Sequence, residues 1–442
     1  MVLKRAGRPK VVDLFAGAGG LSLGFEQAGF DVVAAVEIDP VHAAIHKYNF
    51  PDCEVFPVSV TDLSGRDILR ATGLKAGEVD VVCGGAPCQG FSLIGQRALD
   101  DPRNSLVKDF VRIVSELRPR YFLFENVKGL TVGKHKKFLD EIIGSFDAIG
   151  YDILLPWKVL NAADYGVPQD RQRLILLGAL KGTRLPQYPE RTTHPAGTTN
   201  CGTPESPSCR DALDDIPDAE RFAELNETDQ VRVKKWGKAS EYARKMRCLD
   251  NDSWAFGHPR EWDPSLLTSS AQTQHTDISR NRFEETPPGS VEPVSRFFKL
   301  PPDGVCNTLR AGTDSARGAF TSPRPIHYRY PRCITVREMA RLHSFPDWFR
   351  FHETKWHGAR QIGNAVPPLL AKAVAESIAE AMGYEPQPSD LVLSLGEDGL
   401  LRMSVSQAAE FWGVENPIGR RDKKSGARKR KQHEIEAERL SL

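Results

Sequence analysis

The chain has no C-x-x-C pair, no long apolar run and almost no net charge, and each absence argues against a class of protein. Its eight cysteines are scattered over 442 residues, so nothing indicates a disulfide framework, a zinc site or another metal site. No stretch approaches the length of a membrane span. The N-terminus is basic but lacks the apolar core of a signal peptide. We therefore expect a cytoplasmic protein of a reducing compartment, with no membrane partner.

The formal net charge of +1 decides nothing about nucleic acids, because binding depends on a local basic face and not on the total. Basic residues are dense from Arg420 to Lys431. This tail is predicted to be either a solvated segment or a phosphate-binding arm. The short cluster around Gly7-Arg8-Pro9 is a weaker candidate, for a minor-groove arm.

Apolar runs of strand length alternate with helical patterns in the first 180 residues. Hydrophobic residues make up 40% of the chain, which is enough for a sizeable core. The alternation predicts a doubly wound α/β sheet. The expected strands are Val11–Phe15, Val32–Val36, Val79–Cys83, Tyr121–Phe124 and Arg173–Leu177, and the expected helices between them are 21–28, 105–117 and 136–149.

After about Gly178 this alternation stops, and the chain to about Tyr330 is rich in Pro, Gly, Ser, Thr, Arg and Asp. We interpret it as a second, smaller and irregular domain. Helical patterns return at 335–342 and 369–382. The predicted organisation is a large domain over 1–179, a small domain over 180–350, a return to the large domain over 351–385 and a C-terminal extension over 386–442.

Cys88 is the first candidate for a catalytic residue. It lies in the Gly- and Pro-rich turn Gly84–Ser92, directly after the apolar run Val81-Val82-Cys83. Such a turn lies at the carboxyl end of a parallel strand, where α/β sheets bind ligands. The alternative is that Cys88 is a small buried apolar residue, as most free cysteines are.

The turn Gly17-Ala18-Gly19-Gly20 between a strand and a helix predicts a nucleoside cofactor, with Glu37 placed to accept hydrogen bonds from ribose hydroxyls. Ser22 stands where a dinucleotide fingerprint needs its third glycine, so an adenosine without phosphates fits better. We therefore expect S-adenosyl-L-methionine, with Ile38 under the adenine and Asp62 near its amino group. A glycine turn that only packs a helix, beside a solvated Glu37, is the alternative.

Glu125 ends the apolar strand Tyr121–Phe124, and a carboxyl at that place is costly unless it has a role or a partner. Further along, alternation puts Arg171 and Arg173 on one face, where they can order a carboxylate or a phosphate. Taken alone, Glu125 could simply mark a strand end, and Arg171 and Arg173 could be surface charges at the start of a strand. A thiol, a carboxyl and two arginines at one sheet edge are rarely accidental.

These motifs, in this order, resemble those of the DNA (cytosine-5) methyltransferases of prokaryotes and phages. The resemblance spans about residues 11 to 382. It rests on Asp13–Gly20, Glu37-Ile38-Asp39, Gly85–Ser92, Phe124-Glu125-Asn126-Val127, Gln169–Arg173, Thr335–Leu342 and Gln361–Pro368.

The resemblance implies methylation of carbon 5 of a flipped-out cytosine in a specific duplex DNA sequence. Cys88 would be the thiolate that adds to C6, and Glu125 would act at N3, with Arg171 and Arg173 orienting the groups around it. Helix 369–382 would pack back on the large domain. The implied cofactor residues are Phe15, Ala16, Gly17, Gly19, Gly20, Leu21, Glu37, Ile38, Asp62, Pro87, Asn364 and Val366, and the implied DNA-binding residues are Gln89, Ser92, Thr308 and Arg310.

Two other functions compete with this one. A transfer-RNA methyltransferase of the same family is disfavoured, because its characteristic Cys-Phe-Thr is not found. A catalytically dead DNA-binding regulator is disfavoured by the presence of Cys88, Glu125, Arg171 and Arg173. The preferred interpretation implies a nucleoid-associated monomer or homodimer, with a possible partner restriction nuclease.

The C-terminal extension lies outside the resemblance. Its segment Ser404–Trp412 predicts a capped helix. Ala408, Phe411 and Trp412 are expected to pack on the core, and a DNA-binding or protein-contact element is the alternative.

Overall fold

The structure is a computed structural model, and it describes residues 7–87, 104–131, 135–199, 202–250, 255–313 and 322–416. Three predicted site residues, Cys88, Gln89 and Ser92, lie outside the described residues, as does the basic segment Arg420–Lys431.

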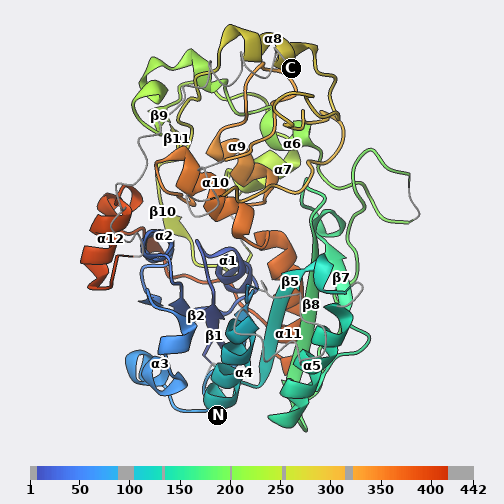
Figure 1. Cartoon of the computed structure of the whole chain (residues 1–442), viewed down its shortest axis with the longest axis vertical. Helices are drawn as coiled ribbons and strands as arrows, with labels where there is room; N and C mark the ends of the chain where they lie inside the picture. The colour runs from blue at the N-terminus through green and yellow to red at the C-terminus, as the bar shows by residue number, and fades with distance from the viewer. Residues whose placement is uncertain are drawn as a thin grey trace, which may run out of the picture.

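Among the described residues, eight strands form one sheet in the order β3-β2-β1-β4-β5-β8-β6, with β7 also paired to β8 (Figure 1). The strands β1 to β5 are parallel, whereas β8 runs antiparallel to β5, β6 and β7. Their bounds are β1 Lys10–Leu14, β2 Asp31–Val36, β3 Glu54–Phe56, β4 Val81–Gly84, β5 Tyr121–Val127, β6 Tyr151–Ile153, β7 Lys158–Asn161 and β8 Gln172–Leu180.

Helices cover both faces of this sheet, so the predicted doubly wound α/β fold is confirmed. Alternate residues of each strand point to opposite faces, and β1 accordingly sends Val11 into one core and Val12 into the other. None of the described helices is long and apolar enough to cross a membrane. One face carries α1 Gly20–Gln27, α2 Pro40–Asn49 and α11 Pro368–Met382, and the other carries α3 Gly65–Thr72, α4 Ser105–Leu117 and α5 His135–Ala148.

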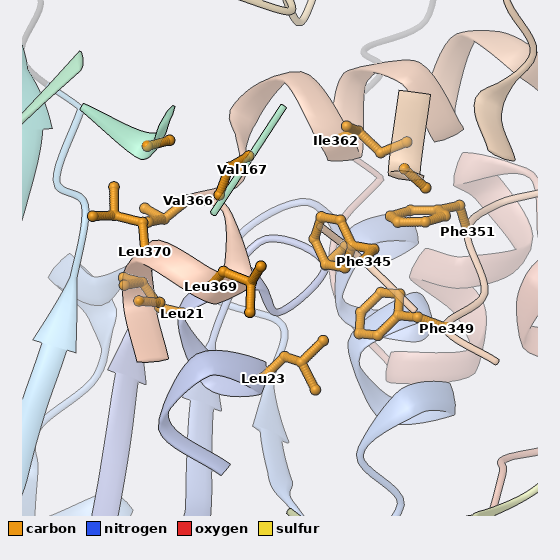
Figure 2. Packing of buried hydrophobic residues seen from close by; sticks show 14 of the residues in the cluster. Leu21, Leu23, Val167, Phe345, Phe349, Phe351, Ile362, Val366, Leu369 and Leu370 are labelled. Carbon is orange, nitrogen blue, oxygen red and sulfur yellow. The ribbon is translucent and has the colours of Figure 1, made fainter. Parts of the chain in front are cut away.

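The helix after Pro367 does return to the sheet, where α11 packs along α1. A Cβ added to Gly24 would lie 2.3 Å from Ala371 Cβ, so only glycine permits this approach. Leu21 lies beside Val366 and Leu370 in the shared core (Figure 2). Segments some 350 positions apart in the sequence therefore build one face of the sheet.

Most of the remaining described chain lies beyond the carboxyl edge of the sheet and consists of short elements joined by irregular segments (Figure 1). Helix α8 is the longest of those between 180 and 350. The bounds are α6 Cys209–Leu213, α7 Glu241–Met246, α8 Asp277–Glu285, α9 Val336–Leu342, α10 Lys355–Asn364, β9 Val231–Arg232, β10 Arg260–Glu261, β11 Leu266–Leu267, β12 Leu393–Ser394 and α12 Val405–Trp412.

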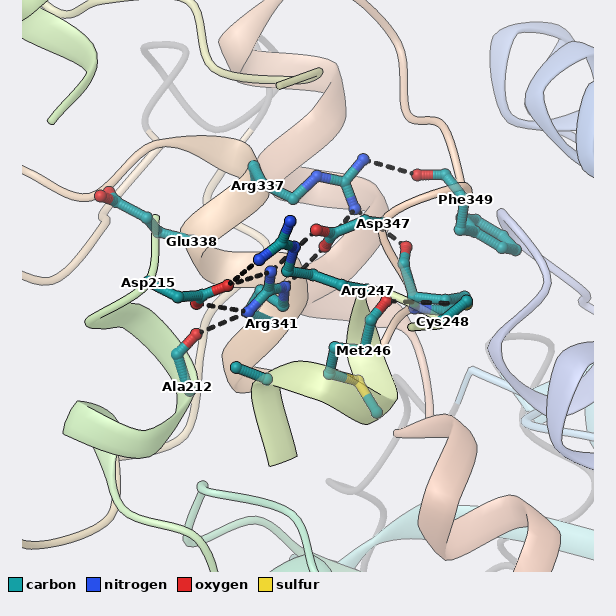
Figure 3. A network of polar contacts seen from close by, with 12 residues as sticks. Ala212, Asp215, Met246, Arg247, Cys248, Arg337, Glu338, Arg341, Asp347 and Phe349 are labelled. Carbon is teal, nitrogen blue, oxygen red and sulfur yellow. Dashed lines mark hydrogen bonds and ion pairs between the residues drawn. The ribbon is translucent and has the colours of Figure 1, made fainter. Parts of the chain in front are cut away.

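Buried ions hold the short helices α6, α7 and α9 together. The Arg341 guanidinium, fully buried on α9, donates to Asp347 at 2.6 Å and to Asp215 at 3.0 Å. Arg337 and Arg247 approach the same two carboxylates from the other sides (Figure 3). Apolar residues of the same elements, such as Leu213, Met246 and Met339, are buried beside these ions, so each charge has to be paired to be tolerated there.

The C-terminal extension contains the predicted capped helix, α12, whose Ser404 side chain accepts from the Gln407 amide. Ala408 is fully buried, and Trp412 packs on the core. The prediction for Phe411 was wrong, because its side chain is 53% exposed. It lies on the outer side of the helix.

Arg8 does not form the minor-groove arm considered from the sequence. Its guanidinium pairs with Asp31 at 2.6 Å and donates to the carbonyls of Phe256 and Phe30 at 2.7 and 3.1 Å. These contacts hold the segment before β1 against Asp31, Phe30 and Phe256.

Candidate active site

A cavity of about 920 Å³ lies at the carboxyl ends of β1, β2, β4 and β5. Segments far along the chain, 308–311 and 360–366, line the same cavity. The large sheet and the irregular region therefore share one site. Its wall includes most of the predicted cofactor residues, namely Phe15, Ala16, Gly17, Gly20, Leu21, Glu37, Ile38, Pro87, Asn364 and Val366.

The glycine turn after β1 shapes one end of this cavity. Gly17 has a φ of +57°, which favours glycine. A Cβ on Gly20 would lie 2.3 Å from the carbonyl oxygen of Val366, so the turn and the returning segment touch. Gly19 differs from the prediction, since it faces His46 of α2 and Phe50, the residue after that helix, and is not part of the cavity wall. Its role is to let α2 approach.

Glu37 follows β2 and joins two parts of the wall. One carboxylate oxygen accepts from the Gly17 amide and the other from the Asp39 amide, both at 2.8 Å. Burial raises the pKa of Glu37, and the nearby His42 opposes that rise. Each oxygen retains a further lone pair for a ligand hydroxyl.

Beside Glu37, Ile38 exposes 64% of its surface at the cavity, as expected for an apolar platform.

Asp62 is the second predicted cofactor residue that does not lie on the cavity wall. It ends a short 3₁₀ turn, Val60–Asp62, and is exposed outside the cavity wall. The wall is formed instead by Val58, Ser59 and Val60, because the chain turns away after Val60.

The Glu125 carboxylate lies at the opposite end of the cavity and pairs with Arg173 Nε at 2.8 Å. Burial raises the pKa of Glu125, while Arg173 and then Arg171 act against that rise. A Cβ on Gly85 would lie 2.4 Å from Glu125 Oε2. The Gly84-Gly85 pair thus allows the carboxyl to lie directly against the turn that leads to Cys88.

Arg173 reaches Glu125 because β8 is antiparallel to β5, which pairs Arg173 with Val127. The start of β8 therefore lies at the carboxyl edge of β5. In an entirely parallel sheet, arginines at a strand start would lie at the far edge.

Arg171 does not contact Glu125 directly, which differs from the predicted orienting role. It is only 1% exposed, and it donates to the carbonyls of Leu309, Gly363 and Ala365 at 2.8–3.0 Å. Burial and the charge of Arg173 lower its pKa. Arg171 thereby ties two distant segments of the wall to the sheet edge.

Asn126 is a residue whose role sequence analysis missed. Its side-chain amide donates to the Ala86 carbonyl at 2.9 Å and so holds the turn before Cys88. Pro87, the last residue described before Cys88, lines the cavity. Its place next to Glu125 in the sequence was the available signal. His42 and Arg360 also line the cavity without having been predicted.

Thr308 and Arg310, the predicted DNA-binding residues that the structure describes, both lie on the cavity wall. The Thr308 hydroxyl donates to the Asp170 carbonyl at 2.7 Å, leaving its lone pairs free to accept. Arg310 is exposed and makes no ion pair with any residue that the structure describes. An unpaired guanidinium at the rim of a cavity is suited to an anionic ligand.

No group of described His, Cys, Asp and Glu side chains has the arrangement of a metal site. The described side chains on the cavity wall include a buried acid, two arginines beside it and several apolar residues.

A family model for "C-5 cytosine-specific DNA methylase" matches residues 9–380. The type II methyltransferase M.XorII of Xanthomonas oryzae pv. oryzae is 59% identical over 411 residues, which cover 93% of this chain and 94% of the relative. M1.HphI of Haemophilus parahaemolyticus, another type II methyltransferase, is 36% identical over 372 residues, covering 83% of this chain and 86% of the relative.

Among solved structures, one described as a DNA modification methyltransferase encoded within an Escherichia coli prophage superposes with a TM-score of 0.68. The two sequences are 32% identical, and the match covers 85% of this chain and 99% of the other.

Proposed function

The chain belongs to the C-5 cytosine-specific DNA methylase family and is a DNA cytosine-5 methyltransferase, and we propose that it acts on a flipped-out cytosine through a covalent adduct of Cys88. The observation that supports this proposal is the ion pair between the Glu125 carboxylate and Arg173 Nε, at 2.8 Å, on the wall of the cavity. Pro87, the residue before Cys88, lies on the same wall. Glu125 lies against Gly85, three residues before Cys88, and addition of a thiolate to a pyrimidine ring requires an acid close to the thiolate.

Cytosine C5 is a poor nucleophile, so the ring must first be activated. The Cys88 thiolate forms a bond to C6 and negative charge develops toward N3, where Glu125 donates a proton or hydrogen bond. C5 thereby becomes an enamine carbon, which would accept the methyl group of a bound sulfonium cofactor and leave that cofactor as a thioether. Loss of the C5 proton to a base and elimination of Cys88 restore the aromatic ring. Neither face of a stacked base is accessible to a thiolate, so the cytosine must leave the duplex.

The residues of the cavity fit S-adenosyl-L-methionine. Glu37 would hold the ribose hydroxyls, Ile38 would lie under the adenine, and the Gly17–Leu21 turn would approach the amino-acid part of the cofactor. When bound, the cofactor supplies the electrophilic methyl group.

For DNA, we propose that residues 180–350 form the target recognition domain, with Arg310 and Thr308 near the extruded nucleotide. A guanidinium suits a guanine edge or a phosphate. Gln89 and Ser92 are proposed to contact DNA from the segment after Cys88. Since the relatives named above are type II methyltransferases, we also propose a partner restriction nuclease for this enzyme.

The test is methylation of duplex DNA by the purified enzyme with methyl-labelled cofactor, followed by nucleoside mass spectrometry. We expect 5-methylcytosine in a short recurring sequence and no label in transfer RNA. Labelled transfer RNA would favour the alternative family member, and tight DNA binding without any label would favour a regulator.

Replacing Glu125 with Gln is expected to lower kcat by about 10²- to 10⁴-fold, the usual worth of a general acid. The wild-type rate should also fall as pH rises through the raised pKa of Glu125, because the protonated form is lost. This part of the pH–rate profile should be absent in the variant. Asp152→Asn, an exposed carboxyl on β6, is the matched control.

Replacing Glu37 with Ala is expected to weaken cofactor binding by about 1–3 kcal/mol, because charge-assisted ribose hydrogen bonds are lost. Calorimetry with S-adenosylhomocysteine measures the change. Unchanged affinity would remove Glu37 from the proposed cofactor site.

A further inference from the structure

Residues 393–412, here called the C-terminal strap, lie against α2 on the side away from the sheet core. Helix α12 and the turn Asp398–Leu401 both pack on α2, and α12 lies beside α2 in Figure 1. The family match ends at residue 380, so the strap lies outside the part of the chain that defines the family.

Hydrogen bonds join the strap to both ends of α2. At the first residue of the helix, Trp412 Nε1 donates to the Pro40 carbonyl at 3.1 Å. At the other end, the Gly396 amide donates to the Tyr48 carbonyl at 2.9 Å, and the Tyr48 hydroxyl donates to Asp398 at 3.3 Å. A Cβ on Gly396 would lie 2.8 Å from Tyr48 Cα, so the two backbones are in close contact.

The strap is itself firmly packed. Leu401, Ala408 and Ala409 are at most 2% exposed. His352 Nε2 donates to the Met403 carbonyl at 3.0 Å, and the Glu353 amide donates to the Leu401 carbonyl at 2.9 Å. The strap is therefore tied to the segment before α10 as well as to α2.

The start of α2 also borders the cavity, whose wall includes Asp39 and His42. His46 and Phe50 pack against Gly19, and the helix is capped by Asp39, whose amide donates to Glu37. Pro40, which Trp412 contacts, directly follows Glu37-Ile38-Asp39. The start of α2 is thus tied to the glycine turn through Glu37, which accepts from the Gly17 amide, and to the strap through Pro40.

We infer that Trp412 is a positioning residue for cofactor binding: through Pro40 it fixes the first turn of α2, and with it the orientation of Glu37 and Ile38. This inference rests on the proposed cofactor site. It gives the C-terminal extension a function distinct from DNA contact. The residue acts through the backbone and does not touch the cofactor.

The test compares Trp412→Phe with the wild-type full-length enzyme. Phenylalanine keeps the ring packing but has no N–H donor, so we expect the Kd for S-adenosylhomocysteine to rise roughly three- to tenfold, the worth of one hydrogen bond. The KM for the cofactor should rise by a similar factor, with kcat, DNA affinity and the thermal midpoint close to wild type. Trp157→Phe, in the segment between β6 and β7, is the matched control, and its cofactor affinity should not change.

Two results would overturn the inference. One is unchanged cofactor affinity in Trp412→Phe while Glu37→Ala weakens binding, which would leave the cofactor site intact and remove the strap from it. The other is a parallel loss of cofactor affinity, DNA affinity and thermal midpoint, which would make Trp412 a general stabilising residue. Absence of S-adenosylhomocysteine binding to the wild-type enzyme would instead contradict the proposed function.

Discussion

Cys88→Ser is expected to lower methyl transfer by roughly 10⁴-fold or more, because the thiolate is the nucleophile and a serine hydroxyl is not ionised near neutral pH. Duplex binding should remain largely intact, since contacts with the phosphate backbone supply most of the affinity. Incorporation of labelled methyl groups and a DNA-binding titration measure the two effects separately. Methyl transfer near the wild-type rate would refute the proposed mechanism.

A duplex carrying 5-fluorocytosine extends this test to the intermediate. Fluorine at C5 removes the proton that elimination requires, so the enzyme should remain covalently attached to DNA. Peptide mapping should locate the adduct at Cys88. The control is Cys83→Ser, a fully buried position in β4, which should still form the adduct. An adduct at Cys83 would show that the wrong thiol had been assigned.

Arg341→Met is expected to destabilise the protein by about 3–5 kcal/mol, the usual effect of removing one partner from a buried ion network. The Asp215 and Asp347 carboxylates would remain buried and, among the residues that the structure describes, would keep Arg247 and Arg337 as cationic neighbours at 3.6 and 3.8 Å. Methionine keeps an unbranched apolar stem like that of arginine but lacks the guanidinium, so lost charge and hydrogen bonds account for most of the effect. Urea unfolding monitored by fluorescence measures the change in the free energy of unfolding.

The pH dependence gives a second signature of this network. Burial alone would raise the pKa of Asp347, but the nearby charge of Arg341 lowers that pKa below the ordinary aspartate value. The stability contributed by ionised Asp347 is present above the ordinary aspartate pKa and is lost as pH falls through the lowered one. The difference between wild type and Arg341→Met should therefore shrink on acidification.

Arg210→Met is the matched control for this prediction. Arg210 pairs with Asp303 at 2.9 Å in the same irregular region, but both side chains are largely exposed. Its replacement should cost less than about 1 kcal/mol. Equal losses in the two variants would show that the buried network contributes no more than a surface pair.

Much of the fold and several site residues could be predicted from the sequence because their signals are local. Apolar runs ending in glycine turns identified β1 and β4, and a carboxyl closing an apolar run identified Glu125. These patterns lie within about ten consecutive residues, so no tertiary contact is needed to find them. The order of the motifs was enough to identify the family.

Only the tertiary structure decided which of these residues meet. The antiparallel pairing of β8 with β5 brings Arg173 to Glu125, whereas Arg171 is directed to carbonyls of segments more than 130 positions away. Gly19 faces α2 and Asp62 faces away from the cavity. Strand direction and close helix packing depend on contacts between distant segments, and no local pattern encodes them.

Local sequence patterns also do not encode the partners of the buried ions or of the C-terminal strap. The sequence by itself determined that Thr335–Leu342 is helical and that Ser404 caps a helix, because cap residues and helical periodicity are encoded locally. It did not determine that Arg341 lies between Asp215 and Asp347, or that Trp412 reaches Pro40, 372 positions earlier. Those partners are chosen by the packing of the whole chain, which brings together groups whose burial is favourable only when each is paired.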